Sequence, residues 1–196
     1  MTSIPDPSPT WSRPLKLVHL LLATAVTIQL FLGSFMRSPH PAQADSAGFL
    51  AHEILGAIIL VLVLAHWAWS STHPDEGLRR LFPWTRRGLR NVYADVRHGI
   101  RERRLPAGGP GTDAGGLASF VHGLGLLAVT AMVVIGSTFF LARLDGATWS
   151  NLNLIEDIHD TVAVIVWIYW GGHLAATLAH SVLHQPVWRR MVDFGK

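Results

Sequence analysis

The sequence predicts an all-α integral membrane protein, a four-helix bundle with both termini on the cytoplasmic side. Of the 196 residues, 49% are hydrophobic and only 15% are charged, so the chain is too apolar for an ordinary soluble domain. The apolar residues gather in four long runs that contain no Lys, Arg or Pro. The cationic residues concentrate in one connection between these runs, and that connection sets the expected orientation.

Residues 1–14 are polar and rich in proline, so we expect a flexible tail there, followed by a single membrane domain over residues 15–196. The first apolar run, residues 17–36, is long enough to cross a hydrocarbon layer of roughly 30 Å at about 1.5 Å per residue. It is too long for the apolar part of an export signal and no small-residue cleavage pattern follows it, so we expect it to be retained. Three further spanning helices are expected on the same grounds over residues 49–69, 117–142 and 158–183.

The connection over residues 71–116 is expected to be the one long segment outside the membrane, and it has a glycine-rich stretch at 107–111 near its end. Within it, apolar residues recur at helical spacing and arginines surround them. The apolar set is Leu89, Val92, Tyr93, Val96 and Ile100, and the basic set is Arg86, Arg87, Arg90, Arg97, Arg101, Arg103 and Arg104. The pattern is typical of a helix that lies on anionic headgroups, the alternative being an ordinary solvated basic helix.

Charge distribution predicts the topology. Nine of the 16 Lys and Arg residues lie in the 71–116 connection, and all but Arg37 and Arg143 lie on the side that it shares with both termini. By the positive-inside rule this side is cytoplasmic. The formal net charge of +3 is too small an excess on so apolar a chain to indicate a nucleic-acid partner, whereas membrane lipid is an expected one.

Seven histidines lie within the four runs, and ionisable groups at membrane depth usually carry function. They are His19, His52, His66, His122, His159, His173 and His180. For any one of them alone, a hydrogen-bonded packing role is an equally good interpretation. Because the chain has no cysteine, thiolate metal sites, iron–sulfur clusters and covalently attached c-type haem are excluded.

The spacing of the histidines favours a cofactor. His159 and His173 are fourteen positions apart, a rise of about 21 Å that returns both side chains close to one helix face. His52 and His66 repeat this interval on the second run. Two imidazoles on facing helices, without a thiolate or carboxylate to complete a tetrahedral set, suit a haem iron whose other ligands come from the macrocycle.

Small residues lie next to several of these histidines, as a flat cofactor requires, although such residues are also common at contacts between membrane helices. They are Ala23, Gly56, Ala163 and the pair Gly171 and Gly172. Three histidines are expected at the same membrane depth as His173, so depth alone does not identify the second ligand. They are His19, His66 and His122.

These motifs resemble the bacterial di-haem b-type cytochromes of the cytochrome b561 and nickel-hydrogenase cytochrome b superfamily. The resemblance covers nearly the whole chain after the tail. It rests on histidines that enter the first and third runs, a His-x-x-x-Gly motif that opens the second, and the fourteen-residue pair followed by Ala-His on the fourth. The residues are Leu17-Val18-His19, His52 to Gly56, Val121-His122-Gly123, His159 with His173, and Ala179-His180.

The resemblance implies two haem b groups with four axial ligands to haem iron: His52 with His159 on the periplasmic side, and His19 with His173 on the cytoplasmic side. His66 is the alternative cytoplasmic-side ligand, followed by His122. Two departures from the family pattern keep these alternatives open. Many members of the cytochrome b561 branch have arginine where this chain has His66, and Leu20 replaces a tryptophan that often follows the first histidine.

The resemblance further implies a protein of the bacterial inner membrane that transfers electrons between the quinone pool and a redox partner protein. Residues 187–191, Val-Trp-Arg-Arg-Met, and the basic connection are more similar to the hydrogenase-type branch, whose members conduct electrons for an attached dehydrogenase. No catalytic residue of the chain's own is expected, and the sequence leaves open whether the protein is an electron carrier or a quinone oxidoreductase.

Quinone, as a substrate, is expected to reach a cleft lined by His66, His122 and Trp67, or one lined by Glu53 and Asp160. Glu156 and Asp157 lie near the second cleft, where such carboxylates either accept protons from a quinol or only mark a polar helix end. One alternative function is a stand-alone oxidoreductase between superoxide, or another small oxidant, and quinone. An alternative of another class is a histidine-based proton or metal-ion transporter, which the lack of internal repeats and of proline within the spans disfavours.

Overall fold

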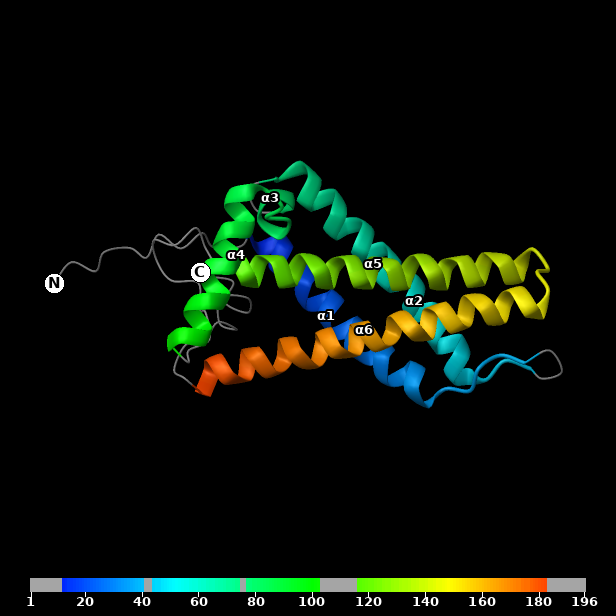
Figure 1. Ribbon diagram of the computed structural model, residues 1–196. Helices are drawn as coiled ribbons and strands as arrows, with labels where there is room; N and C mark the ends of the chain where they lie inside the picture. Colours follow the sequence, from blue (N-terminus) through cyan, green and yellow to red (C-terminus); the bar gives the residue numbers. More distant parts are fainter. Residues whose placement is uncertain (1–11, 41–43, 75–76, 103–115, 183–196) are drawn as a thin grey trace. The chain divides into compact units, whose positions relative to one another are not determined.

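The computed structural model describes residues 12–40, 44–74, 77–102 and 116–182, and these contain six helices and no strand (Figure 1). The helices are α1 (Arg13–Phe35), α2 (Ala47–Thr72), α3 (Leu78–Leu81), α4 (Arg86–Glu102), α5 (Gly116–Leu144) and α6 (Trp149–Val182). Several sequence features lie outside the described residues. They are most of the expected tail, Arg103, Arg104, the glycine-rich stretch at 107–111 and the 187–191 motif.

Helices α1, α2, α5 and α6 are long and apolar enough to cross a membrane, and they correspond to the four runs in the sequence. Many of their large apolar side chains face outward, among them Ile58, Val61 and Leu64 of α2. In water such exposure would be costly, but in lipid it is the expected state. The prediction of an all-α integral membrane protein is confirmed.

The helix ends differ from the expected ones where polar residues extend an apolar run. Helix α1 begins at Arg13, so Pro14 lies in its first turn, where the missing N–H of proline costs no hydrogen bond. Helix α6 begins at Trp149, nine residues before the expected start at 158. The added residues are mostly polar, so hydropathy alone did not assign them to the helix.

The turn between α5 and α6 is short because α5 ends in a hydrogen-bonded cap. Gly146 has φ of 77°, a left-handed conformation that glycine adopts without steric cost. Its N–H donates to the carbonyl of Arg143, and the N–H of Ala147 donates to the carbonyl of Ala142. This pair of bonds is a Schellman motif, which satisfies carbonyls at the helix end and reverses the chain.

The described residues divide into two compact units, one within the ranges 17–67 and 125–172 and the other within the ranges 1–16, 68–124 and 173–196. We call the first the core unit and the second the basic unit. The core unit packs parts of α1, α2, α5 and α6 around a buried apolar cluster. Its buried members are Leu22, Ala25, Leu30, Ile59, Val63, Val129 and Val166.

Two indole hydrogen bonds join pairs of helices in the core unit. The Nε1 of Trp67 on α2 donates to Oγ1 of Thr130 on α5 at 3.0 Å. The Nε1 of Trp170 on α6 donates to Oγ1 of Thr27 on α1 at 2.9 Å. Because a buried indole N–H without a partner would be costly in an apolar layer, each bond also fixes which helix faces are in contact.

In the basic unit, the connection that the sequence placed between the second and third spans contains α3 and α4. Helix α3 packs on α5 at Gly123, where an added Cβ would collide with the carbonyl oxygen of Leu81. Gly123 therefore lets the backbone of α3 approach α5 directly.

Candidate functional site

The core unit brings together His52 of α2 and His159 of α6, two of the four histidines that the sequence singles out as ligands. Their ring centroids lie 6.1 Å apart and the ring planes are inclined at 71°. Both side chains are partly buried. Two imidazoles bound to one metal ion through bonds of about 2 Å have centroids on the order of 6 Å apart. The observed spacing therefore admits one ion between the two rings.

Two glycines that the sequence reasoning missed lie against this pair. A Cβ on Gly33 of α1 would be 3.3 Å from Cε1 of His52, and a Cβ on Gly136 of α5 would be 3.7 Å from Nε2 of His159. Helices α1 and α5 thus present bare backbone beside the two rings, and this backbone leaves width for a flat macrocycle. In the sequence, these glycines are indistinguishable from those that only allow close helix contact.

The backbone of His52 is held by a polar side chain from α1. The Nε2 of Gln29 donates to the carbonyl oxygen of His52 at 3.0 Å. A Cβ on Gly56 would come within 3.4 Å of the same Nε2. Gly56, which the sequence suggested as a small residue beside a cofactor, therefore gives room to the amide of Gln29.

Two buried polar atoms beside this bond have no hydrogen-bond partner among the described residues. They are Nδ1 of His52 and Oε1 of Gln29. Folded proteins leave few buried polar atoms unsatisfied, and the exceptions often belong to ligand or redox sites. The surroundings of His52 thus fit an axial ligand of a haem better than a packing histidine.

The basic unit brings together His122 of α5 and His173 of α6. Their ring centroids lie 5.0 Å apart with the planes at 87°. Nδ1 of His122 lies 2.7 Å from the carbonyl oxygen of Ala118, which can only accept a hydrogen bond. The neutral ring is therefore protonated at Nδ1 and carries its lone pair on Nε2. His122 was the last of the three candidates opposite His173, and it is the one that the structure places against it within the same unit.

His19 and His66, the other two candidates, belong to the core unit. His66 is buried, with 7% of its surface exposed, whereas His19 is partly buried. The pairing of His19 with His173 stays a prediction.

Among the described residues, no three or more His, Cys, Asp or Glu side chains gather into a group that could hold a metal ion. Four of the described histidines meet instead in pairs, His52 with His159 and His122 with His173. A pair of imidazoles supplies the two axial positions of a haem iron, whose remaining four ligands belong to the porphyrin. The donor sets present therefore fit haem.

An ion-pair network next to the first pair was not foreseen. The guanidinium Nη2 of Arg143 donates to both carboxylate oxygens of Asp45, at 2.8 and 2.7 Å. Nη1 of Arg143 lies 3.9 Å from Oε1 of Glu53, the residue after His52. The same guanidinium lies over the ring of Phe49, 5.4 Å from its centroid. One cation is thus shared between two carboxylates, Asp45 and Glu53.

Two of the acidic residues predicted near this site face outward. The side chain of Asp160 is 77% exposed, although its Oδ1 is 3.9 Å from Nδ1 of His159, and Asp157 is also exposed. Because α6 begins at Trp149, neither residue lies at the end of the helix, where one of the two sequence interpretations placed them. Trp67, expected to line a quinone cleft, has its N–H bonded to Thr130 in the helix packing.

A family model described as prokaryotic cytochrome b561 matches residues 10–194. The matched range contains the four membrane helices and all seven of their histidines. The chain matches no curated protein and no solved structure at a significant level.

Proposed function

Since the chain belongs to the prokaryotic cytochrome b561 family, whose members carry electrons on haem b in membranes, we propose that it is a di-haem cytochrome linking the quinone pool to a redox partner protein. The observation that carries the proposal is the His52–His159 pair, with centroids 6.1 Å apart and glycines of two other helices beside it.

His52 and His159 would hold the first haem iron. Bound haem supplies one-electron redox chemistry, while the protein sets the ligands, their orientation and the dryness of the site. Gln29 fixes the turn of α2 that carries His52 through the bond to its carbonyl oxygen. Nearby apolar side chains of the core unit exclude water, which raises the influence of each remaining charge on the iron. Arg143 is one such cation, through its contact with Glu53, and Asp45 and Glu53 offset it.

His173 would hold the second haem iron, with His19 as the opposite ligand that the family pattern implies. His122 would act on His173 from beside it, since their rings are in contact and the bond to Ala118 orients the imidazole of His122. A side chain packed against a ligating histidine helps to fix the orientation of its ring.

Electron exchange with a lipid-soluble quinone suits a chain whose described residues form membrane helices joined by short connections on one side. Glu53 is the carboxylate best placed to accept a quinol proton, because it is adjacent to His52 and only 21% exposed. We further propose that the protein lies in the bacterial inner membrane with both termini in the cytoplasm. The charge distribution supports this topology.

The first prediction concerns the number of haems. The purified protein is expected to contain two haem b per chain, and His159→Ala to contain one, because the other iron keeps its own ligands. A reduced-minus-oxidised difference spectrum together with haem extraction measures both values. His180→Ala, which alters a histidine of the same helix that is not assigned as a ligand, should keep two haems. A colourless wild-type protein would instead support a histidine-based transporter, and two haems in His159→Ala would refute the pairing.

The second prediction identifies the partner of His173. His173→Ala and His19→Ala should each lose the second haem, whereas His66→Ala and His122→Ala should keep it. The second-haem band and the haem-to-protein ratio of the four variants provide the comparison. Loss in His122→Ala with retention in His19→Ala would make the contact pair of the basic unit the ligand pair.

The third prediction is that a reduced quinone analogue reduces the haems within stopped-flow mixing times. Glu53→Gln should slow this reduction by about tenfold or more if its carboxylate accepts the quinol proton, since general bases commonly contribute at least that much. Asp157→Asn, which alters an exposed carboxylate of α6, serves as the control. If no haem is reduced although the measured potentials favour it, the protein is a conduit between proteins only.

The fourth prediction concerns orientation, and the absence of cysteine allows single labels to be introduced. Ala94→Cys on α4 and Thr148→Cys before α6 are both at exposed positions. In intact spheroplasts, a membrane-impermeant maleimide should label Thr148→Cys and should reach Ala94→Cys only after lysis. The reverse pattern would place the termini outside the cytoplasm.

A further inference from the structure

We infer that α4 (Arg86–Glu102) is an interfacial helix that docks on the anionic headgroups of the bilayer, with Arg90, Arg97 and Arg101 binding lipid phosphates. The inference concerns a helix that contains none of the residues of the two histidine pairs. It rests on three features of α4: a tether to the start of a membrane span, an exposed apolar stripe, and a row of arginines beside that stripe.

The tether joins α4 to the first turn of α5. The backbone N–H of Leu117 donates to Oδ2 of Asp95 at 3.1 Å, so a carboxylate of α4 caps the start of α5. A Cβ on Gly116 would lie 3.0 Å from the backbone nitrogen of Val92, so the two backbones are in close contact. The apolar part of α5 begins at this point. Helix α4 is therefore held where a membrane span enters the bilayer.

The apolar stripe of α4 is exposed. Leu89, Tyr93 and Val96 are 48%, 66% and 37% exposed, and their spacing places them on one face of the helix. This face is distinct from the side that meets α5, because Val92 and Asp95 are rotated by about 65° and about 125° from the centre of the stripe at about 100° per residue. An exposed apolar stripe on a strongly basic helix is the usual composition of a helix that lies in the headgroup region.

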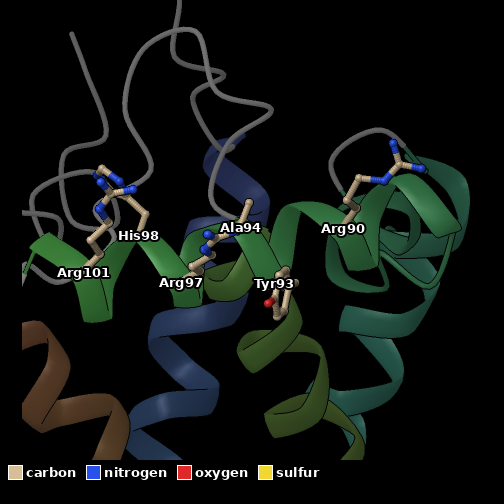
Figure 2. Close-up of a pocket in the computed structure, with 6 residues that line it drawn as sticks. All are labelled: Arg90, Tyr93, Ala94, Arg97, His98 and Arg101. Atoms are coloured by element: carbon tan, nitrogen blue, oxygen red, sulfur yellow. The ribbon is translucent and has the colours of Figure 1, made fainter.

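The arginines form a row next to the stripe. Arg86, Arg90, Arg97 and Arg101 repeat at intervals that keep them along one side of the helix. Figure 2 shows Arg90, Arg97 and Arg101 with Tyr93, Ala94 and His98, and these six residues line a hollow of about 250 Å³. Guanidinium groups bind phosphate oxygens through paired hydrogen bonds, and a tyrosine between them suits the boundary between headgroup and acyl chain.

An anionic bilayer is the occupant that satisfies all three features together. An acidic protein would match the arginines, but the tether places the helix at the level where lipid is already its neighbour. The five arginines of α4 outnumber its two acidic residues, and one of these, Asp95, is engaged by α5. The remaining positive charge faces a surface that carries negative charge when anionic lipid is present.

The test uses the full-length protein with its haems, reconstituted in vesicles of phosphatidylcholine alone or with phosphatidylglycerol. The single variant Val96→Cys carries a polarity-sensitive dye on the apolar stripe, and His98→Cys carries the same dye on another face. In vesicles with phosphatidylglycerol, lipid-borne quenchers should quench the Val96→Cys dye at least about twofold more than the His98→Cys dye. Pure phosphatidylcholine or high salt should reduce this difference, because both weaken the attraction between arginines and headgroups.

Replacing the arginines tests their part directly. Each of Arg90→Gln, Arg97→Gln and Arg101→Gln should lower the ratio of docked to undocked helix by about fivefold, the equivalent of about 1 kcal/mol per cation at an anionic surface. Arg37→Gln, which removes an exposed arginine outside α4, should have no effect. Haem content of each variant confirms that it is folded.

Two results would overturn the inference. One is a Val96→Cys dye that aqueous iodide reaches equally well in both kinds of vesicle, which would leave a protein partner as the occupant of this face. The other is equal docking of the wild type and the glutamine variants, which would exclude phosphate binding by the arginines. The comparison of lipids needs no arginine variant, so it remains decisive if one of them fails to fold. Neither readout depends on electron transfer.

Discussion

Inside a hydrocarbon layer no water is present to bind polar groups, and the structure follows from this constraint. Backbone N–H and C=O groups are satisfied within continuous helices, which is why the four apolar runs fold as α1, α2, α5 and α6. Two indole N–H groups in the core unit are bound to other helices, Trp67 to Thr130 and Trp170 to Thr27. Histidines at this depth require an equally specific partner. A metal ion with imidazole ligands supplies one, because coordination replaces the hydrogen bonds that water would make.

The site between His52 and His159 combines two kinds of residue with opposite demands. The histidines must be held in place, and Gln29 does so from α1 through the carbonyl of His52. The glycines must leave room, and Gly33 and Gly136 do so on the helices that carry no ligand of this pair. In the proposed haem site, two helices would thus contribute ligands and two would contribute space. This division explains how a bundle can hold a wide, flat group without opening its apolar core to lipid.

Local signals in the sequence account for much of this arrangement. Hydropathy predicts the four spans, and the helical period of residues 89–100 predicts α4. The sequence did not reveal that Gly33 and Gly136 lie against His52 and His159, because these glycines look like any other glycine of a membrane helix. The bond between Arg143 and Asp45 joins residues 98 positions apart, and nothing local marks such a pair. From the sequence, His19, His66 and His122 are all expected at the membrane depth of His173, so depth could not choose among them.

The same reasoning explains why the start of α6 was misjudged. Residues 149–157 are mostly polar, and a hydropathy criterion ends where they begin. What places them in the helix is the reversal at Gly146, since a chain that turns with a Schellman motif can resume helical geometry within two or three residues. The signal was a single glycine next to an aspartate, and its meaning depended on the helix that precedes it.

That reversal also sets which residues of α5 and α6 stand at the same height. Gly136 lies ten positions before Gly146 and His159 thirteen positions after it, and the structure brings the two within contact distance. One residue more or fewer in the turn would slide one helix along the other by about 1.5 Å and rotate it by about 100°. Ile135 or Ser137 would then tend to replace the bare backbone beside the imidazole. The length of the loop Asp145–Thr148 therefore helps to determine the geometry of the site. Natural variants of this protein should tolerate substitutions in that turn more readily than insertions or deletions.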